Sequence, residues 1–306
     1  MQSPGALTPT SAMKRRLAWL GAWILATALL VVCARTVDWT RALEVLSTAH
    51  VVWLGFAVLL NGVILVCWAA FWRALRPDDE APASYGRMFE IVATASSLMN
   101  TVPFGGGHAS SIVLLMRRGN MTQGGALSVL ALDQLGEGIT KVSLFVLVAA
   151  LLPLPTWMRA GVTTASLVVA AWFITLMVAS RWARGLGILK HWRRSIAALA
   201  CVIAMKGVEA LALAAVQHAL GLSLSPGGTL LVLAALILGT MLPVAPANLG
   251  TYEASVFLAY RYLGVSPEQA LTLAVVEHVC FLLPSVGVGY AFISAHTLSR
   301  SAIASR

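Results

Sequence analysis

The chain has 306 residues, of which 59% are hydrophobic and 11% are charged. Soluble globular domains carry about 25% charged residues, so the composition excludes that class and predicts one membrane domain without a separate soluble catalytic module. The net charge of +9 comes from short basic clusters beside apolar runs, which is typical of cytoplasmic loops, so no nucleic-acid partner is expected.

The amino-terminal segment predicts a tail followed by a membrane span. Residues 1–13 are small and polar and are expected to form a disordered cytoplasmic tail, and residues 14–298 are expected to form the transmembrane domain. The apolar run 17–34 has 18 residues, whereas the apolar region of a signal peptide has about 7–15. We interpret it as the first span; a signal peptide cleaved after Ala34 is the alternative.

Further apolar runs predict the rest of the fold. Asp38 predicts the start of a short amphipathic helix at the outer interface, with Trp39 and Leu43 on its apolar face. Uninterrupted runs long enough to cross about 30 Å of hydrocarbon follow, and two interrupted runs predict re-entrant hairpins. The sequence therefore predicts an all-α polytopic membrane protein with about six full transmembrane helices plus two re-entrant broken-helix hairpins. The uninterrupted runs are 51–72, 126–152, 161–180, 196–220 and 270–295, the interrupted ones are 88–116 and 229–262, and 299–306 form a cytoplasmic tail.

The two interrupted runs contain the candidate substrate path. Proline removes a backbone donor and blocks helix continuation. Broken backbone at membrane depth persists only where it is buried in protein or lines a wet cavity. The breaks therefore predict a polar path, formed by Asn100, Pro103, Gly107 and His108 in the first run and by Pro243, Pro246, Asn248, Gly250 and Glu253 in the second.

The distribution of lysine and arginine predicts the orientation. With the amino terminus inside, 15 of these residues fall in cytoplasmic segments and four fall outside. Positive residues concentrate on the cytoplasmic side of membrane proteins. Both termini are therefore expected in the cytoplasm, with the protein in the plasma (inner) membrane.

The two broken stretches align with each other. Gly107 pairs with Gly250, Gly119 with Gly264, Ala126 with Ala270 and Asp133 with Glu277, at offsets of 143, 145, 144 and 144. Three predicted spans separate the two hairpins, and an odd number turns the second copy upside down. Such inverted repeats are typical of secondary transporters. The alternative is two independent glycine-rich kinks that align by chance.

Several charged residues fall within predicted spans. A charge at the centre of a membrane costs about 2.5–3.5 kcal/mol on insertion scales, so it must be paired, lie near an interface or face water. Glu137–Lys141 and Lys206–Glu209 have the spacing of helix-surface ion pairs. No lysine or arginine lies within one turn of Asp133, Glu253 or Glu277, so these acids are candidates for lining the path. His108 either titrates or contacts a phosphate there, or is a structural donor.

The second break resembles the flippase-like transmembrane region of lysylphosphatidylglycerol synthases. The pattern is Pro243, Pro246, Asn248-Leu249-Gly250, Glu253 and Leu263-Gly264-Val265, and the first half is similar through Asn100, Pro103, Gly107, Gly119, Asp133 and Glu137. The resemblance covers roughly residues 14–298 and implies a protein that moves or handles lipids such as aminoacylated phospholipid, hopanoid or polyprenyl-linked species. It departs from the family at His108, Ser111 and Gln134, where an acid or an arginine is common, which weakens the case for a phosphate clamp there.

The sequence leaves three functions open. The first is a lipid flippase or transporter with no cofactor, with a membrane lipid as substrate and lipid-biosynthesis enzymes as candidate partners. The second is a membrane-embedded enzyme acting on a lipid headgroup, with Asp133, Glu137 or Glu277 as general acid or base. The third is a non-catalytic accessory subunit of a lipid-modifying complex. No HExxH, GxSxG or Walker pattern occurs in the sequence, and the scattered histidines do not predict a metal site.

Overall fold

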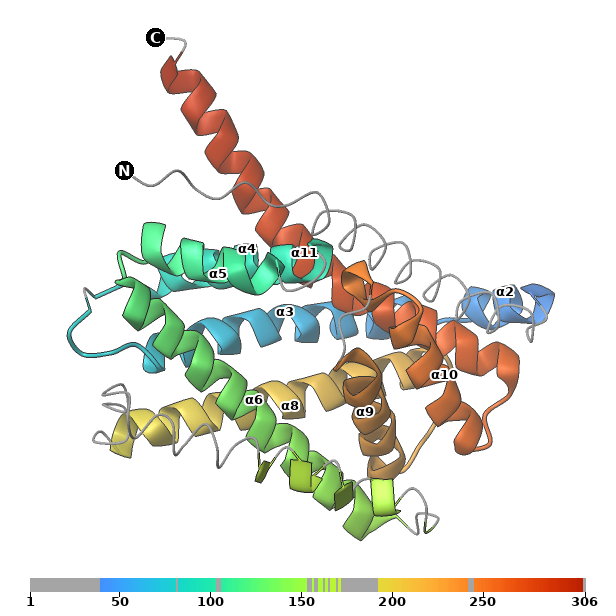
Figure 1. Ribbon diagram of the computed structural model, residues 1–306. Helices are drawn as coiled ribbons and strands as arrows, with labels where there is room; N and C mark the ends of the chain where they lie inside the picture. Colours follow the sequence, from blue (N-terminus) through green and yellow to red (C-terminus); the bar gives the residue numbers. More distant parts are fainter. Residues whose placement is uncertain are drawn as a thin grey trace, which may run out of the picture.

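In a computed structural model, the protein is a bundle of helices (Figure 1). The structure describes residues 39–80, 82–102, 106–152, 192–241 and 245–304, together with scattered positions between 156 and 171. Four of the described helices, α3, α6, α8 and α11, are long and apolar enough to cross a membrane. The chain is therefore an all-helical membrane protein. The predicted tail 1–13, the predicted span 17–34 and about half of 161–180 lie outside the described residues.

The predicted runs that the structure describes correspond to helices, and most of their ends agree within a few residues. The uninterrupted runs 51–72, 126–152, 196–220 and 270–295 are α3, α6, α8 and α11, and each interrupted run is split into shorter helices. The last helix continues through most of the predicted carboxy-terminal tail. The elements are α2 (Trp39–Ser47), α3 (Val51–Ala74), α4 (Tyr85–Thr101), α5 (Gly106–Arg117), α6 (Gln123–Leu151), α8 (Trp192–Ala219), α9 (Pro226–Thr240), the 3-10 turn η2 (Pro246–Asn248), α10 (Thr251–Tyr262) and α11 (Pro267–Ala304).

Hydroxyl side chains fix the starts of four helices. The first amides of a helix have no partner within the helix. Ser84, Thr122 and Ser225 each accept a hydrogen bond from the amide three residues further on. Ser266 likewise accepts from the amide of Gln269 at 3.3 Å, at the start of α11. These starts are therefore specified locally by the sequence.

Helices α3 and α8 pack against each other along the centre of the bundle. At one end, the amide of His50 donates to the carbonyl of Ala219 at 2.9 Å. At the other end, Arg194 at the start of α8 forms an ion pair with Asp78, which follows α3. The two helices are therefore antiparallel, and the Val51 end and the Ala74 end of α3 mark the two ends of the bundle.

The turns that follow the two broken runs lie at opposite ends of α3. The turn between α5 and α6 is held at the Ala74 end, because Glu80 accepts a hydrogen bond from the amide of Thr122 at 3.0 Å. The turn between α10 and α11 lies at the Val51 end, where the Gln269 side chain donates to the carbonyl of Leu220 at 3.1 Å. Figure 1 shows the same separation of the two turns.

Two parts of the chain have the same order of elements. After α3 come α4, a break, the 12-residue α5 and the long α6, and after α8 come α9, a break, the 12-residue α10 and the long α11. Each long helix packs on the other part's broken pair, α11 on α4 and α6 on α9. The predicted pairing of Gly119 with Gly264 is shifted by one residue, because Asn120 (φ 51°) and Gly264 (φ 84°) are the left-handed residues of the two turns.

The buried apolar side chains form two clusters separated along the helices. On α6, one cluster ends at Leu130 and the other begins at Leu144. On α8, the corresponding limits are Met205 and Ala212. Between these limits lie Asp133, Glu137 and Lys141 on α6, and Lys206 and Glu209 on α8. The fold therefore holds a polar layer between two apolar clusters.

Candidate functional site

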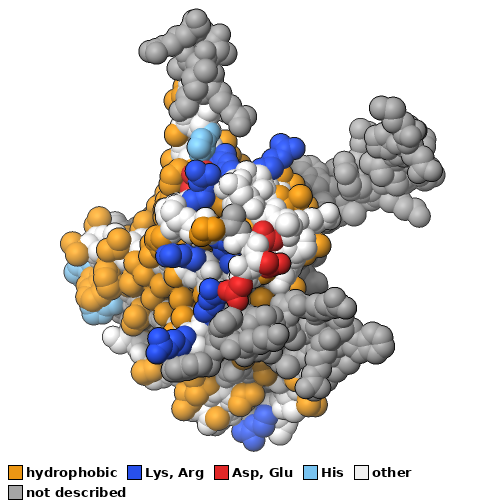
Figure 2. Space-filling model, turned by 90° about the vertical axis from the view of Figure 1, so that its left-hand side faces the viewer, with side chains coloured by type: hydrophobic (Ala, Val, Ile, Leu, Met, Phe, Trp, Pro, Cys, Tyr) orange, Lys and Arg blue, Asp and Glu red, His pale blue; other side chains and the backbone are white. Residues whose placement is uncertain are grey.

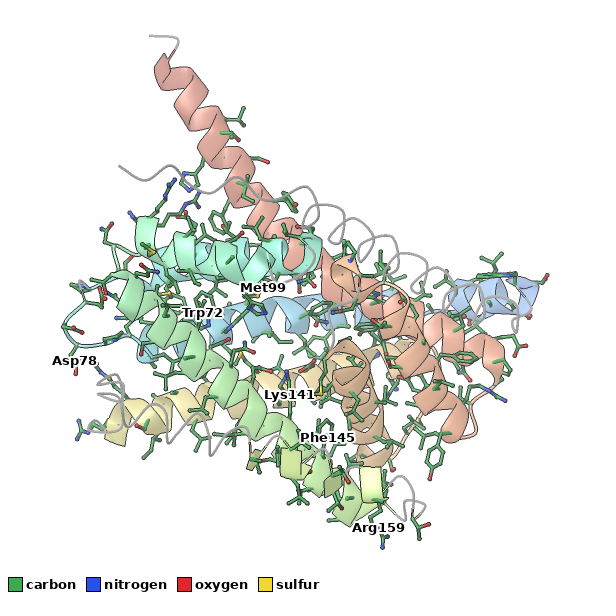
Figure 3. The ribbon with its side chains drawn as sticks, in the orientation of Figure 1. Trp72, Asp78, Met99, Lys141, Phe145 and Arg159 are labelled. Carbon is green, nitrogen blue, oxygen red and sulfur yellow. The ribbon has the colours of Figure 1, made fainter. Side chains whose placement is uncertain are left out.

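A cavity of about 180 Å³ lies in the polar layer. Its walls come from α3, α6, α8, α9, α10, α11 and η2. Glu137 and Lys206, which line it, stand near the middle of the 29-residue α6 and the 28-residue α8, so the cavity lies at mid-depth of helices that can span a membrane. Figure 3 shows Lys141 in the same central region. The polar lining residues are Asn61, Glu137, Lys141, Lys206, Glu209, Thr240, Asn248, Tyr252 and Glu277.

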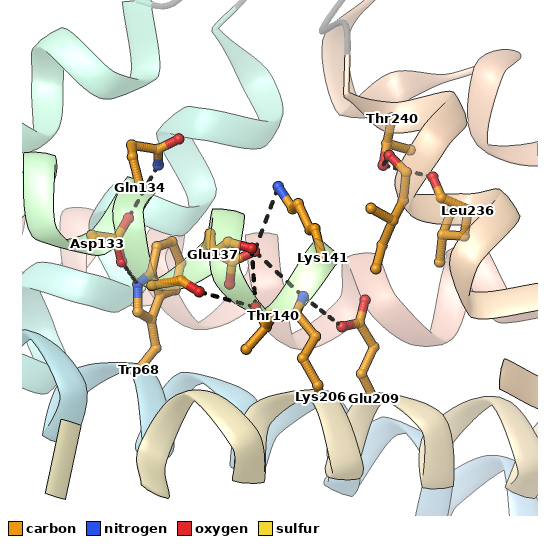
Figure 4. A network of polar contacts seen from close by, with 12 residues as sticks. Trp68, Asp133, Gln134, Glu137, Thr140, Lys141, Lys206, Glu209, Leu236 and Thr240 are labelled. Atoms are coloured by element: carbon orange, nitrogen blue, oxygen red, sulfur yellow. Dashed lines mark hydrogen bonds and ion pairs between the residues drawn. The ribbon is translucent and has the colours of Figure 1, made fainter. Parts of the chain in front are cut away.

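Four charged side chains form a connected network on one side of the cavity (Figure 4). A carboxylate oxygen of Glu137 lies 3.5 Å from the ammonium of Lys141 and 3.4 Å from that of Lys206. Lys206 also lies 3.0 Å from Glu209. Each charge therefore has an opposite charge beside it, which offsets the cost of removing it from water.

The network confirms two sequence predictions and adds one contact. Glu137–Lys141 and Lys206–Glu209 are ion pairs within α6 and within α8, as their spacing predicts. The contact of Lys206 with Glu137 joins the two helices, and helical spacing holds no signal for it. The pairs therefore connect two helices of the bundle as well as stabilising each one.

Glu277 on α11 reaches the same cavity from the other part of the chain. Only 2% of this residue is exposed, and one carboxylate oxygen accepts a hydrogen bond from the Tyr260 hydroxyl. Tyr260 in turn accepts from Gln217 at 2.9 Å, and Gln217 accepts from Thr229 at 2.8 Å. The second oxygen, Oε2, is buried and has no hydrogen-bond partner among the described residues. A buried acceptor of this kind requires a donor from a ligand, from water or from its own protonation.

The second break contributes Asn248 to the cavity. Ala247 and Asn248 have left-handed backbone, with φ of 54° and 53°, and Gly250 follows with φ of 85°. The Oδ1 atom of Asn248 is buried and, like Glu277 Oε2, lacks a partner among the described residues. Pro246 begins the 3-10 turn, whereas Pro243 lies outside the described residues. The break thus presents an acceptor to the same space as Glu277.

Glu253 lies beside the second break but does not line the cavity. It accepts a hydrogen bond from the amide of Gly250 at 2.7 Å, which caps the start of α10. Its other oxygen accepts from His278 Nδ1 at 2.7 Å, and the His278 ring stacks on Tyr252 with centroids 4.0 Å apart. These contacts anchor the break to α11.

Asp133 is buried one helical turn before Glu137 on α6 and is also absent from the cavity lining. Its Oδ1 atom accepts hydrogen bonds from the indole N–H groups of Trp68 at 2.9 Å and Trp72 at 2.8 Å. Gln134 donates to the other oxygen at 3.2 Å. The carboxylate is thus held by neutral donors and joins α6 to α3.

None of the described residues of the first break lines the cavity. Asn100 donates to the carbonyl of Ser96 within its own helix at 2.9 Å, and His108 is exposed. Gly107 packs so closely on the backbone of Met99 that a side chain there would clash. Pro103 lies outside the described residues. Within the described residues, only the second break reaches the cavity, and its η2 turn contacts α4.

The sequence matches the family described as "Lysylphosphatidylglycerol synthase TM region" over residues 19–289. The chain belongs to this family. A search of curated proteins found no match. Membership of the lysylphosphatidylglycerol synthase TM-region family agrees with the helical membrane fold and relates the protein to lipid modification.

The site of this family member contains residues that the sequence did not single out. Two of them, Asn61 and Tyr252, line the cavity. Tyr260 donates a hydrogen bond to Glu277, and Gln217 donates one to Tyr260. The sequence feature that could have identified them is a polar side chain within an apolar helix. A single sequence does not show which neighbouring helix such a side chain contacts. Among the residues that the structure describes, no group of three or more His, Cys, Asp or Glu side chains is placed to hold a metal.

Proposed function

We propose that the protein is a lipid transporter of the plasma membrane that moves a lipid headgroup between leaflets through the mid-membrane cavity. The observation that carries this proposal is a pair of buried acceptors in one cavity, Glu277 Oε2 and Asn248 Oδ1, for which the described residues supply no hydrogen-bond donor. Ionisable groups inside a membrane mark substrate or ion paths, because a buried charge without function is costly. The two acceptors favour a headgroup with N–H or O–H donors.

The size of the cavity supports a headgroup, not a whole lipid. A volume of about 180 Å³ is below the 300–1,000 Å³ or so that is usual for drug-sized ligands. In this proposal the acyl chains stay in the bilayer while the headgroup exchanges its water for the polar lining. The charged network would supply part of this lining, as would Asn248 at the second break.

We extend the proposal to a membrane arrangement with two re-entrant hairpins in an inverted repeat. Helices α5 and α10 have 12 residues each, so each is about 18 Å long and cannot cross about 30 Å of hydrocarbon. The turns after them lie at opposite ends of α3, which supports hairpins that enter from opposite faces. With both termini cytoplasmic, reporter fusions after Arg194 should score cytoplasmic and those near Pro226 periplasmic. The reverse pattern would contradict this orientation.

A transport assay tests the function. The purified protein, reconstituted in liposomes, should speed leaflet exchange of a labelled lipid from a panel of aminoacylated, hopanoid and polyprenyl-linked species, and leave the lipid's mass unchanged. Glu277→Gln should slow the exchange at least about tenfold, and Glu44→Gln on the exposed α2 serves as the matched control. A change in lipid mass would indicate an enzyme instead. Failure to exchange any lipid of the panel would indicate an accessory subunit that acts with lipid-biosynthesis enzymes.

A further inference from the structure

A second pocket lies at the Ala74 end of the bundle, apart from the mid-membrane cavity. It has a volume of about 540 Å³ and is formed by the end of α3, the loop after it and the start of α8. Figure 2 shows this face, where basic and acidic side chains gather. Figure 3 places Asp78 at the same end of the molecule. The charged and polar residues that line the pocket are Arg73, Arg76, Asp78, Glu80, Tyr85 and Arg194.

The two acids of this pocket are engaged within the protein. Glu80 accepts hydrogen bonds from the amide of Thr122, at 3.0 Å, and from the Thr122 hydroxyl. Asp78 forms an ion pair with Arg194, which joins the loop to α8. These contacts hold the walls of the pocket together. Of the two other arginines that line the pocket, Arg73 is exposed to solvent and Arg76 is buried.

Arg76 is the unusual residue of the pocket. It is buried, with only 8% of the residue exposed. Its Nε and Nη2 atoms nevertheless have no hydrogen-bond partner among the residues that the structure describes. Burial lowers the pKa of Arg76, and the nearby Glu80 charge partly opposes this although it makes no ion pair with the guanidinium. A buried guanidinium without a partner is strongly unfavourable. An anion in the pocket would satisfy it.

The geometry favours a phosphate group as this anion. The guanidinium offers a planar fork of N–H donors that matches phosphate oxygens in a bidentate manner. Arg73 precedes Arg76 by three residues at the end of α3 and lines the same pocket. It therefore offers a second positive charge to an anion that Arg76 binds. The charge distribution of the sequence places this end of the bundle at the cytoplasmic side, at the level of lipid phosphates.

We propose that this pocket binds a phosphate group through Arg76 and Arg73. The phosphate belongs either to a phospholipid of the adjacent leaflet or to a soluble phosphate compound. The site is separate from the mid-membrane cavity and does not depend on the transport proposal, since a protein without exchange activity would still bind phosphate here.

Binding to the purified full chain in detergent tests the proposal. Phosphatidylglycerol is titrated and followed by native mass spectrometry, with diacylglycerol as the phosphate-free lipid. Inorganic phosphate is titrated separately and followed by the thermal unfolding temperature, with chloride at the same ionic strength as the control. Saturable binding of phosphatidylglycerol alone identifies a lipid phosphate, and stabilisation by inorganic phosphate identifies a soluble one. Either result supports the site, and the absence of both overturns it.

Arginine variants locate the binding. Arg76→Gln should weaken it at least about tenfold, as expected for the loss of a charged hydrogen-bonding group. Arg73→Gln should weaken it less. The matched control is Arg117→Gln, which removes the same charge from an exposed position at the end of α5. Arg76→Gln should fold, because it removes a buried charge that no described residue hydrogen-bonds through Nε or Nη2. Equal weakening by Arg117→Gln and Arg76→Gln would show general charge attraction and overturn the proposal.

Discussion

The ammonium of Lys206 on α8 lies 3.4 Å from the carboxylate of Glu137 on α6. The same ammonium lies 3.0 Å from Glu209, so one cation is shared by two acids in the middle of the bundle. This arrangement makes the cation more important than either acid, because its removal takes a counterion from Glu137 and from Glu209 at once. It also makes α6 and α8 mutually dependent at the depth of the cavity.

Lys206→Met should therefore destabilise the protein strongly. Breaking a fully buried ion pair by removing one partner costs about 3–5 kcal/mol. The side chains of Lys206 and its two acidic partners are 19–24% exposed, so the loss should lie at or below the lower end of that range. Thermal unfolding in detergent should show a lower transition temperature for Lys206→Met. The double variant Lys206→Met/Glu209→Gln should recover much of the loss, because Glu137 keeps its ion pair with Lys141. A wild-type transition for the single variant would show that the network does not stabilise the fold.

Glu277→Gln and Tyr260→Phe should separate function from folding. The glutamine keeps an oxygen acceptor for the Tyr260 hydroxyl, so the variant should accumulate normally. Its lipid exchange rate should fall at least about tenfold, because the substrate loses a hydrogen bond to a charged group. Tyr260→Phe removes the donor and leaves a buried oxygen unsatisfied, which costs about 1–3 kcal/mol of stability. Lipid exchange in liposomes and thermal unfolding measure the two effects. If Glu277→Gln fails to accumulate while Tyr260→Phe is stable, Glu277 is a structural residue.

Asn248→Cys should react with a small water-soluble thiol reagent, because its side chain lines the polar cavity. Leu59→Cys is the control, since Leu59 is 62% exposed on a membrane-spanning helix and would face lipid. Both are placed in a background without the native cysteines, and labelling is followed by mass. Equal protection at both positions would show that water does not enter the cavity.

Thr122→Ala should cost more stability than Ser266→Ala. Each residue caps a long helix, and loss of such a cap costs about 0.5–2 kcal/mol. Thr122 also donates its hydroxyl to Glu80, so its replacement removes a second hydrogen bond that holds the loop after α3. Thermal unfolding of the two variants, compared with the wild type, measures the difference. The opposite order would mean that Glu80 is held mainly by the amide of Thr122.

The sequence predicted helices well and their contacts only in part. Apolar runs locate α3, α6 and α8 because length and hydropathy are local properties. Helical spacing likewise predicts Glu137–Lys141, since residues four apart share a face. It does not show that α8 presents Lys206 to that face. Such contacts depend on how helices pack, which no single helix determines.

Glu277 and His278 illustrate the limit of a prediction from neighbouring residues. They are adjacent in sequence, but successive residues of a helix point about 100° apart, since a turn has 3.6 residues. Glu277 therefore lines the cavity and binds Tyr260, whereas His278 binds Glu253 and stacks on Tyr252. The partner of Glu253 is thus 25 residues away in sequence, beyond any one-turn search for a counterion.

The crossed packing of the long helices has a consequence for biosynthesis. Because α11 packs on α4 and α6 packs on α9, each half of the chain completes the core of the other. Neither half is then an independent folding unit, and the ribosome must finish the last helix before α4 is covered. If the gene were cut in the connection between α6 and α8, each fragment alone should be degraded, and co-expression of the two should restore both.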